Sequence, residues 1–349
     1  MQVKFDIQKL VRENLKSLRP YSSARDEYVS DGSQMTFLDA NENPYENGAN
    51  RYPDPQQRKL KEVLGNLKGV RTANMLLGNG SDEVLDLIFR AFCEPHEDNI
   101  VTLPPTYGMY KVLAGINAIE NRELVLTKDF QLDVEAIMNT VDFNTKLLFI
   151  CSPNNPTGNS FASKDILTLL QEFKGLVVID EAYVDFSDGQ SWVSKLSDFP
   201  NLIIVQTLSK AFGMAGIRLG ICMASEEIIA IMNTIKPPYN VNELTQQHAL
   251  RGLANISLIK SAVKEIREQK SLIEQVLPKI PFVEHIFPSD TNFLLVRVDD
   301  ADLRYEQLLK MGVVVRNRSN QPLCENTLRL TIGTPEENIK LVTALKALA

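Results

Sequence analysis

The sequence has few of the residues that build disulfide frameworks or metal sites. Its four cysteines lie far apart among 349 residues and form no CxxC pair, and its three histidines show no ligand spacing with one another or with cysteine. We therefore expect reduced thiols and no bound metal. No apolar run approaches the length of a membrane span, and the first residues lack the apolar region of a secretory signal, so we expect a cytoplasmic protein without membrane contacts.

An excess of basic charge is also lacking. The formal net charge is −7, whereas proteins whose main partner is a nucleic acid usually carry a basic face. We therefore expect no nucleic-acid partner. Hydrophobic residues make up 44% of the chain and charged residues 23%, which is typical of a folded protein long enough for one large and one smaller domain.

Short apolar runs alternate with helical patterns in the first two thirds of the chain. The runs DNIVTL, KLLFICS, GLVVIDE and NLIIVQT are each bounded by turn residues, and amphipathic segments such as SDEVLDLIFRAF separate them. This alternation predicts an α/β fold with a mostly parallel sheet flanked by helices. Ligands bind such sheets beyond the carboxyl ends of the strands, and polar residues gather at those positions here.

The chain is predicted to have three parts. Residues 1–30 form an N-terminal arm with one amphipathic helix, which ends before Pro20. Residues 31–270 form the large domain, including a long linking helix, and residues 271–349 form a small α+β domain. The small domain is expected to have strands at TNFLLVRV, GVVVRN and LRLTIG. Its last helix is expected to start at Thr334, with a proline at the first helical position and a capping box.

Two charged residues follow apolar runs at predicted strand ends. Lys210 comes after NLIIVQT, and a lysine that is held partly desolvated there can form imines, although most single lysines are merely solvated. Asp180 ends the run GLVVID, where a carboxylate needs a cationic partner or a raised pKa. A protonated pyridine nitrogen is one such partner.

The glycine-rich run GNGSDE opens a predicted helix and could hold a phosphate group at the helix N-terminus. It matches neither the dinucleotide nor the nucleoside-triphosphate pattern. It is equally consistent with a plain turn in which Ser81 or Asp82 caps the helix. Arg218 could supply the second phosphate contact through paired hydrogen bonds, and Thr207 and Ser209 add hydroxyl donors beside it.

Eight motifs occur in an order that resembles the fold-type-I pyridoxal-phosphate aminotransferases, and within them the histidinol-phosphate aminotransferases. They are NENP, RYPDP, GNGSDE, PPTYGMY, SPNNPTG, IDEAY, TLSKAFGMAGIRLG and LRLTIGT. The resemblance covers nearly the whole chain. It implies the fold of that family, pyridoxal 5'-phosphate as cofactor and a homodimeric enzyme.

The resemblance also implies roles for individual residues. Lys210 attaches the cofactor and carries a proton, Asp180 pairs with the pyridine nitrogen, and Tyr183 completes the catalytic set. The implied cofactor-binding residues are Ser81, Asp82, Tyr107, Asn155, Asp180, Tyr183, Thr207, Ser209, Lys210 and Arg218. Among these, Tyr107 stacks on the ring, and Asn155 and Tyr183 face its hydroxyl group.

The implied substrate-binding residues are Tyr21, Tyr52, Arg316 and Arg329. Tyr52 reaches across from the other subunit of a homodimer, and Arg329 lies where relatives bind an anionic group of the substrate. Arg318, two residues after Arg316, could compete for its role. Each of these residues could also be an ordinary surface residue.

The function that the resemblance implies is the interconversion of histidinol phosphate and 2-oxoglutarate with imidazole-acetol phosphate and glutamate, in histidine biosynthesis, with ping-pong kinetics. An aromatic amino-acid transaminase and a decarboxylase of phosphorylated amino acids are alternatives on the same fold. A catalytically silent sensor subunit that binds pyridoxal phosphate is a third, non-enzymatic alternative. The combination of Lys210, Asp180 and Arg218 disfavours it.

Overall fold

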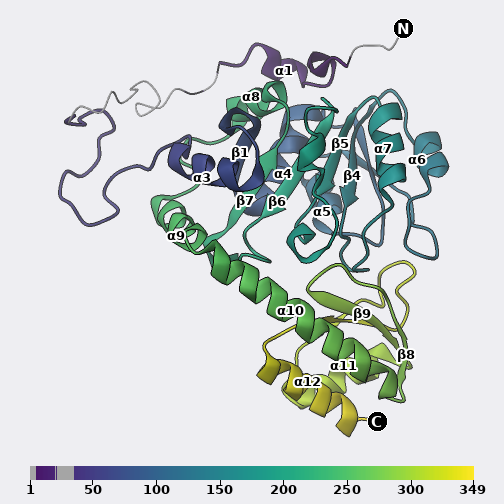
Figure 1. The fold of residues 1–349 in the computed structure, drawn as a ribbon. Helices are drawn as coiled ribbons and strands as arrows, with labels where there is room; N and C mark the ends of the chain where they lie inside the picture. Colours follow the sequence, from purple (N-terminus) through teal and green to yellow (C-terminus); the bar gives the residue numbers. More distant parts are fainter. Residues whose placement is uncertain (1–4, 20, 22–34) are drawn as a thin grey trace.

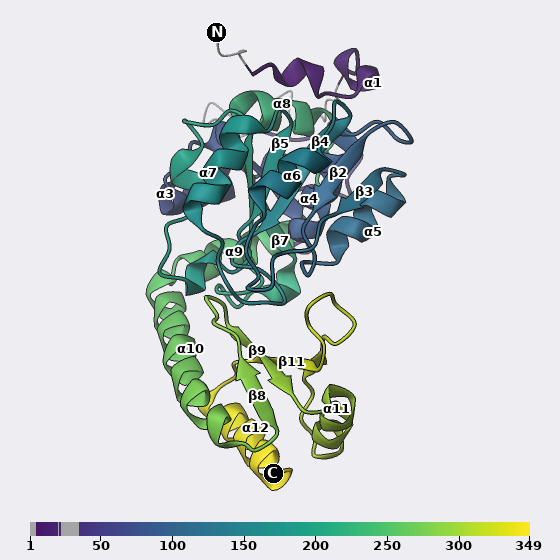
Figure 2. The ribbon, with the colours of Figure 1, turned by 90° about the vertical axis from the view of Figure 1, so that its right-hand side faces the viewer.

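A computed structural model describes residues 5–19, 21 and 35–349. Two sheets lie at opposite ends of the long helix α10 (Ile256–Val276), which runs from the larger body of the molecule to the smaller one (Figures 1 and 2). The C-terminus lies on the smaller body, and residues 5–19 lie at the far end of the larger one (Figure 1). The predicted combination of a large sheet with flanking helices and a smaller α+β unit is confirmed.

The larger sheet has seven strands in the order β1-β7-β6-β5-β4-β2-β3. Only β7 runs against the others, because it pairs antiparallel with both β1 and β6. The four predicted runs became β2, β4, β5 and β6. The bounds are β1 (Met75–Asn79), β2 (Asn99–Thr102), β3 (Glu120–Glu123), β4 (Thr145–Cys151), β5 (Leu176–Asp180), β6 (Leu202–Thr207) and β7 (Leu219–Met223).

Helices cover both faces of this sheet, because its central strands are apolar on both sides. Leu148 and Ile150 of β4 face one core cluster, which α3, α6, α7 and α9 complete. Leu147 and Phe149 face the other, which α4, α5 and α8 complete. The bounds are α3 (Arg58–Lys68), α4 (Gly80–Phe92), α5 (Met109–Ile116), α6 (Val134–Thr140), α7 (Ser163–Glu172), α8 (Glu226–Ile235) and α9 (Glu243–Leu253).

The smaller sheet is antiparallel, in the order β10-β11-β9-β8, and packs against α11 and α12 around its own apolar cluster. The last helix starts as predicted. Thr334 accepts a hydrogen bond from the backbone N–H of Glu337, and the Glu337 side chain accepts one from the backbone N–H of Thr334, which completes a capping box. The bounds are β8 (Val283–Ile286), β9 (Phe293–Val298), β10 (Arg316–Asn317), β11 (Thr327–Thr331), α11 (Ala301–Lys310) and α12 (Pro335–Ala347).

The predicted single helix of the N-terminal arm is wrong. Two short elements replace it, the 3₁₀ helix η1 (Ile7–Lys9) and α1 (Glu13–Lys16). The chain is extended at Arg12, whose backbone N–H donates to the carbonyl of Ala91 and whose guanidinium binds Glu94. These contacts with the end of α4 outweigh the local helix pattern. The remaining 3₁₀ helices are η2 (Thr72–Asn74), η3 (Val184–Phe186), η4 (Trp192–Lys195), η5 (Ala215–Ile217) and η6 (Leu277–Lys279).

Three further sequence expectations concern absences. All four cysteines are buried and free. Among the residues that the structure describes, no group of His, Cys, Asp and Glu could hold a metal ion. No helix in those same ranges combines the length and apolar character that crossing a bilayer requires.

Candidate active site

Lys210 lies in the turn that follows β6, at the carboxyl edge of the larger sheet. Its Nζ atom is 5.6 Å from the ring centroid of Tyr183. Although the side chain as a whole is exposed, partial burial of the ammonium group lowers the pKa of Lys210, and the positive charge of Arg329 lowers it further. A lowered pKa makes an amine a better nucleophile and base near neutral pH, so the turn suits an imine-forming lysine.

Asp180 ends β5 and is only 3% exposed. One carboxylate oxygen, Oδ2, accepts a hydrogen bond of 2.8 Å from the hydroxyl of Tyr110, and Oδ1 accepts one of 3.0 Å from the backbone N–H of Ala182. Burial raises its pKa to about 6. Asp180 forms no ion pair with any residue that the structure describes, so this buried carboxylate fits a cationic group of a bound molecule.

The start of α4 packs closely against Arg218. The backbone N–H of Gly80 donates to the carbonyl of Arg218 over 3.0 Å. Gly80 has φ +80, and a Cβ atom there would lie 2.6 Å from Nη2 of Arg218. Only glycine fits this approach. Asp82, in the first turn of α4, accepts hydrogen bonds from Nη2 of Arg218 at 3.4 Å and from the hydroxyl of Tyr107 at 2.9 Å.

Two hydroxyl side chains lie on the neighbouring strand end. Thr207 pairs with Gly220 of β7, and a Cβ atom on Gly220 would lie 2.4 Å from the backbone nitrogen of Ser81. The hydroxyl of Thr207 accepts from the backbone N–H of Ser209 at 3.1 Å and donates to the hydroxyl of that residue at 3.0 Å. We call Ser81, Asp82, Thr207, Ser209 and Arg218 the α4 cradle.

The α4 cradle has the donors that a phosphate group requires. The first N–H groups of a helix have no acceptor within the helix and carry a partial positive charge. In α4 they lie beside a guanidinium and two hydroxyl groups. The alternative in which Ser81 or Asp82 caps α4 does not hold, because Asn79 occupies the cap position and makes no side-chain capping bond. The N–H group of Gly80 is used by the carbonyl of Arg218, so the N–H groups of Ser81 and Asp82 are the ones that could bind a ligand.

Arg329 of β11 joins the smaller sheet to the larger one. Its Nη1 atom donates to Oδ1 of Asn155, which follows β4. The guanidinium lies 5.1 Å from the ring centroid of Phe293, and the ring of Tyr183 meets the same phenylalanine edge-on at 5.3 Å. Arg329, Asn155 and Tyr183 therefore meet where the two sheets approach, and the charge of Arg329 acts on Lys210.

Three arginines in and directly after the strands of the smaller sheet form what we call the arginine cluster: Arg316 of β10, Arg318 just after β10, and Arg329 of β11. Arg316 pairs with Arg329 across β10 and β11. The pKa of Arg318 is lowered to about 10, first by burial and then by the charges of the other two. None of the three forms an ion pair within the described ranges. The Nε atoms of Arg318 and Arg329 are buried without a hydrogen-bond acceptor. Such uncompensated charge is what an anionic ligand would neutralise.

Two predicted substrate residues, Tyr21 and Tyr52, are exposed in this chain. Tyr21 is 75% exposed and Tyr52 is 51% exposed. The ring of Tyr52 stacks on Tyr239, with 4.4 Å between the centroids. Within the described part of the chain, no contact joins Tyr21 or Tyr52 to Lys210.

The sequence interpretation missed Tyr110, the donor to Asp180. Its motif, PPTYGMY, was recognised, but only Tyr107 was given a role in it. The signal that could have found it is the spacing of three residues between Tyr107 and Tyr110. This spacing brings both tyrosines to one side of the chain where α5 starts. The rings of Tyr107 and Tyr110 meet edge-on, 5.6 Å apart.

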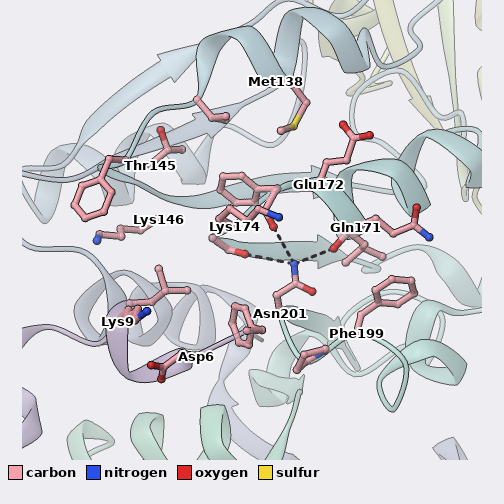
Figure 3. Close-up of a pocket in the computed structure, with 18 of the residues that line it drawn as sticks. Asp6, Lys9, Met138, Thr145, Lys146, Gln171, Glu172, Lys174, Phe199 and Asn201 are labelled. Carbon is pink, nitrogen blue, oxygen red and sulfur yellow. Dashed lines mark hydrogen bonds between the residues drawn. The ribbon is translucent and has the colours of Figure 1, made fainter. Parts of the chain in front are cut away.

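A cavity of about 820 Å³ lies away from these residues, at the amino ends of the parallel strands (Figure 3). It lies near the starts of β4, β5 and β6, and none of the predicted site residues lines it. The amide of Asn201 in this cavity is already used, since it donates to the backbone carbonyls of Leu170, Phe173 and Gly175 (Figure 3). The predicted catalytic residues therefore lie at the other edge of the sheet, where the parallel strands have their carboxyl ends.

The sequence profile of the family described as aminotransferase class I and II matches residues 30–345. The chain belongs to this family. Among curated class I and II relatives, the histidinol-phosphate aminotransferase of Flavobacterium johnsoniae is 60% identical over 345 residues, which are 99% of each chain. That of Christiangramia forsetii is 61% identical over 344 residues, 99% of this chain and 98% of the relative.

Solved structures share this aminotransferase fold. The histidinol-phosphate aminotransferase from Clostridium acetobutylicum has a TM-score of 0.79 and 26% identity, covering 85% of this chain and 90% of that one. The enzyme from Sinorhizobium meliloti, solved in complex with pyridoxal-5'-phosphate, has a TM-score of 0.76 and 22% identity, covering 86% and 84%. An L-threonine-O-3-phosphate decarboxylase from Porphyromonas gingivalis has a TM-score of 0.73 and 23% identity, covering 85% and 90%, so the fold alone does not select the reaction.

Proposed function

We propose that this protein is a histidinol-phosphate aminotransferase of histidine biosynthesis. It would transfer the amino group from glutamate to imidazole-acetol phosphate, giving 2-oxoglutarate and histidinol phosphate, and the opposite direction is equally allowed. The names of relatives 60–61% identical over nearly the full length support this reaction. The structural observation that carries the proposal is the arginine cluster, a second anion site separate from the α4 cradle and without an acidic partner in the described ranges.

Pyridoxal phosphate is the proposed cofactor, and when bound it supplies an aromatic aldehyde whose protonated ring withdraws electrons from the carbon bearing the amine. The site fits such a molecule because it offers an amine, a buried carboxylate without a cation, and a phosphate cradle at one sheet edge. The residues proposed to hold it are Ser81, Asp82, Tyr107, Asn155, Asp180, Tyr183, Thr207, Ser209, Lys210 and Arg218.

Asp82 and Asn155 have specific parts in this proposal. The Asp82 carboxylate would repel a phosphate group, so its side chain would act by orienting Arg218 and Tyr107, to which it is hydrogen bonded, and its backbone N–H would be the group that binds the phosphate. Asn155 accepts from Arg329 through Oδ1, which leaves its amide N–H groups to donate to the ring hydroxyl oxygen together with Tyr183.

Lys210 is the proposed base. Its lowered pKa increases the fraction of free amine, which accepts the proton from the amine-bearing carbon of the substrate. Asp180, with a pKa of about 6, is mostly ionised above that pH and holds a positive charge on the group beside it. The two residues therefore have different tasks: Lys210 moves a proton, and Asp180 keeps one in place.

The arginine cluster is proposed to bind the phosphate ester of histidinol phosphate and a carboxylate of glutamate. Guanidinium groups bind both anions through paired hydrogen bonds. Arg329 is connected to Asn155, so an anion at the cluster lies on the same side of the site as Lys210. Tyr21 and Tyr52 are proposed to add hydroxyl donors.

Steady-state kinetics test the substrate assignment. Histidinol phosphate, histidinol and phenylalanine are compared as amino donors to 2-oxoglutarate, and the glutamate that forms is measured. We expect kcat/KM for histidinol phosphate to exceed that for histidinol by about 100-fold or more, because histidinol lacks the charged hydrogen bonds to the arginine cluster. A preference for phenylalanine would indicate an aromatic transaminase. Carbon dioxide release from phosphothreonine would indicate a decarboxylase. Binding of pyridoxal phosphate without turnover of any donor would indicate a sensor subunit.

We further propose that the enzyme is a homodimer in which Tyr52 serves the site of the partner. Leu38 and Tyr45, in the segment that precedes Tyr52, are exposed, and so is Leu244, which lines a pocket together with Tyr52. Exposed apolar and aromatic side chains that form a patch mark interfaces. The segment before Tyr52 projects from the body of the molecule (Figure 1). The domain boundaries near residues 30 and 270 and the cytoplasmic location remain predictions.

Mixing two inactive variants tests the shared site. Tyr52→Ala and Lys210→Ala are purified separately, mixed under conditions that allow subunit exchange, and assayed. If Tyr52 acts in the partner's site, each mixed dimer has one site with both native residues, so activity reappears to about one quarter of the wild-type value. A mixture no more active than its components, from a protein that sediments as a monomer, would reject the proposal.

A further inference from the structure

Tyr110 is a buried polar residue that the proposed mechanism has not used. It is the second residue of α5, its side chain is fully buried, and its hydroxyl donates to Oδ2 of Asp180 over 2.8 Å. The backbone N–H of Ala182 donates to the other oxygen, Oδ1. Each carboxylate oxygen can accept about two hydrogen bonds, so both retain a free position toward a bound cation.

The ring of Tyr110 is held by an aromatic stack. It lies 4.8 Å from the ring of Phe149 at an interplanar angle of 19°, and Phe149 in turn stacks on Phe89 at 5.2 Å. On another side the ring meets Tyr107 edge-on at 5.6 Å. Offset and edge-to-face aromatic pairs of this kind are favourable, and a fully packed ring has one orientation. The hydroxyl of Tyr110 is therefore aimed at Asp180 by the core itself.

We propose that Tyr110 is a positioning residue that keeps Asp180 ionised and fixes the plane of its carboxylate. A hydrogen bond donated to a carboxylate favours the charged form. It opposes the burial that favours the neutral form of Asp180. The groups that act electrostatically on Asp180 from all the surrounding elements are Asp82, Tyr107, Tyr110, Cys151, Tyr183 and Lys210.

Of these groups, Tyr110 is the one whose hydroxyl is hydrogen bonded directly to the carboxylate. Lys210 also favours the ionised form, and Asp82 disfavours it. The thiol of Cys151 stays protonated, because burial raises its pKa far above neutrality. Loss of the Tyr110 hydroxyl would therefore leave Asp180 with the N–H of Ala182 and a more distant lysine.

The first test uses the protein without cofactor, so it does not depend on the proposed function. Asp180 is titrated by carboxyl ¹³C NMR in wild type and in Tyr110→Phe, and its signal is assigned by its absence in Asp180→Asn. Phenylalanine keeps the aromatic stack and removes only the hydrogen bond. We expect the pKa of Asp180 to rise by about one to two units, because hydrogen bonds to charged groups are among the stronger ones.

A matched control is Tyr305→Phe, which removes a phenol hydroxyl from the smaller body, where Tyr305 packs against the apolar cluster. It should leave the Asp180 titration unchanged. Tyr110→Leu, which also disrupts the stack, should broaden or shift the signal further. An unchanged Asp180 titration in folded Tyr110→Phe would overturn the proposal.

The second test rests on the proposed function, because it asks how the residue affects the cofactor. Dissociation constants of pyridoxal phosphate are measured by fluorescence between pH 5.5 and pH 8.5. In wild type we expect affinity to fall as pH drops through about 6, where Asp180 becomes protonated. In Tyr110→Phe the fall should begin one to two units higher, giving about two- to tenfold weaker binding at pH 7.

An analogue of pyridoxal phosphate with CH in place of the ring nitrogen completes this test. Since it cannot carry the positive charge, its affinity should be equal in wild type and Tyr110→Phe. If wild type binds neither compound, the proposed function fails while the NMR result on Asp180 still decides the role of Tyr110. If the analogue loses affinity as strongly as the cofactor, Tyr110 acts through packing and the positioning role is rejected.

Discussion

The α4 cradle and the arginine cluster are both suited to anions, but they are built in different ways. In the cradle, Arg218 already has a carboxylate partner, Asp82, and its backbone is tied to Gly80. In the cluster, no acidic residue of the described ranges compensates the arginines, and their charges act on one another. The charge of Arg218 is therefore partly compensated before a ligand binds, whereas the charges of the cluster are compensated only when an anion binds.

This difference corresponds to two kinds of ligand. A resident cofactor suits a site whose geometry is fixed by glycine contacts, helix N–H groups and a strand end. Substrates that exchange in each turnover suit a site on another sheet, where charge provides attraction and the anion differs from one half-reaction to the next. Substitutions of Arg329 and Arg218 separate the two sites, since each should affect one ligand and spare the other.

The largest effect is expected for Lys210→Ala, which removes the amine between the two anion sites. Turnover should fall by about 10⁴-fold or more, because one residue provides both the attachment point and the proton carrier. The absorbance band of lysine-bound cofactor should disappear, while phosphate binding at both anion sites persists. Lys264→Ala, at an exposed position on α10, is the matched control. Comparable turnover in the two variants would contradict the role of Lys210.

Arg329→Ala should affect the substrate more than the cofactor. We expect KM for histidinol phosphate to rise by about 10- to 100-fold, in line with loss of charge-assisted hydrogen bonds. The dissociation constant of pyridoxal phosphate should change by about twofold at most. Arg251→Ala removes an exposed arginine of α9 and should change neither quantity. A variant with unaltered KM for histidinol phosphate would show that the arginine cluster does not bind the substrate.

Arg218→Ala should give the opposite result. Pyridoxal phosphate should bind about 10-fold more weakly, and KM for histidinol phosphate at saturating cofactor should stay near the wild-type value. The loss is expected to be smaller than at Arg329, because helix N–H groups and the hydroxyls of Thr207 and Ser209 remain. The measurement is equilibrium dialysis of the cofactor alongside steady-state kinetics. If the binding of both ligands weakens equally, the two sites are coupled and the comparison between them fails.

The same two regions show what sequence patterns can predict. The parallel strands were predictable because their apolar runs are buried on both faces, and polar residues at their ends marked the cradle. The antiparallel β7 was not singled out, because its run LGICM differs little from the parallel strands and pairing direction leaves no local pattern. The short β10 was overpredicted as GVVVRN, since Val314 is 75% exposed despite its apolar character.

Side-chain partners were harder to predict than elements. The hydrogen bond from Tyr110 to Asp180 joins residues 70 positions apart, and the bond from Arg329 to Asn155 spans 174 positions. Neither hydrogen bond leaves a periodic pattern in the sequence, because each depends on how the order of the strands brings distant strand ends together. The break at Arg12 has the same origin, a contact with the distant end of α4.

The buried charge of Asp180 should reduce the stability of the large-sheet region. Its pKa is raised in the folded protein, so the folded state binds more protons, and its stability falls as pH rises from about 4 to about 6. Asp180→Asn without cofactor should therefore be more stable than wild type at pH 7.5, by about 1–3 kcal/mol, measured by urea unfolding. The gain should vanish near pH 4. A destabilised variant at pH 7.5 would mean that the carboxylate is needed for packing.

The smallest effect is expected at Thr334, which separates the stability of the smaller body from its anion binding. Thr334→Ala removes one half of the capping box of α12 and should cost about 1 kcal/mol of unfolding free energy. Thr334→Ser keeps the hydroxyl and serves as control. Because the arginine cluster lies on β10 and β11, KM for histidinol phosphate should not change at a temperature where both variants are folded. A KM that rises together with the loss of stability would mean that the cluster depends on the packing of α12, and the effect of Arg329→Ala could then no longer be ascribed to charge alone.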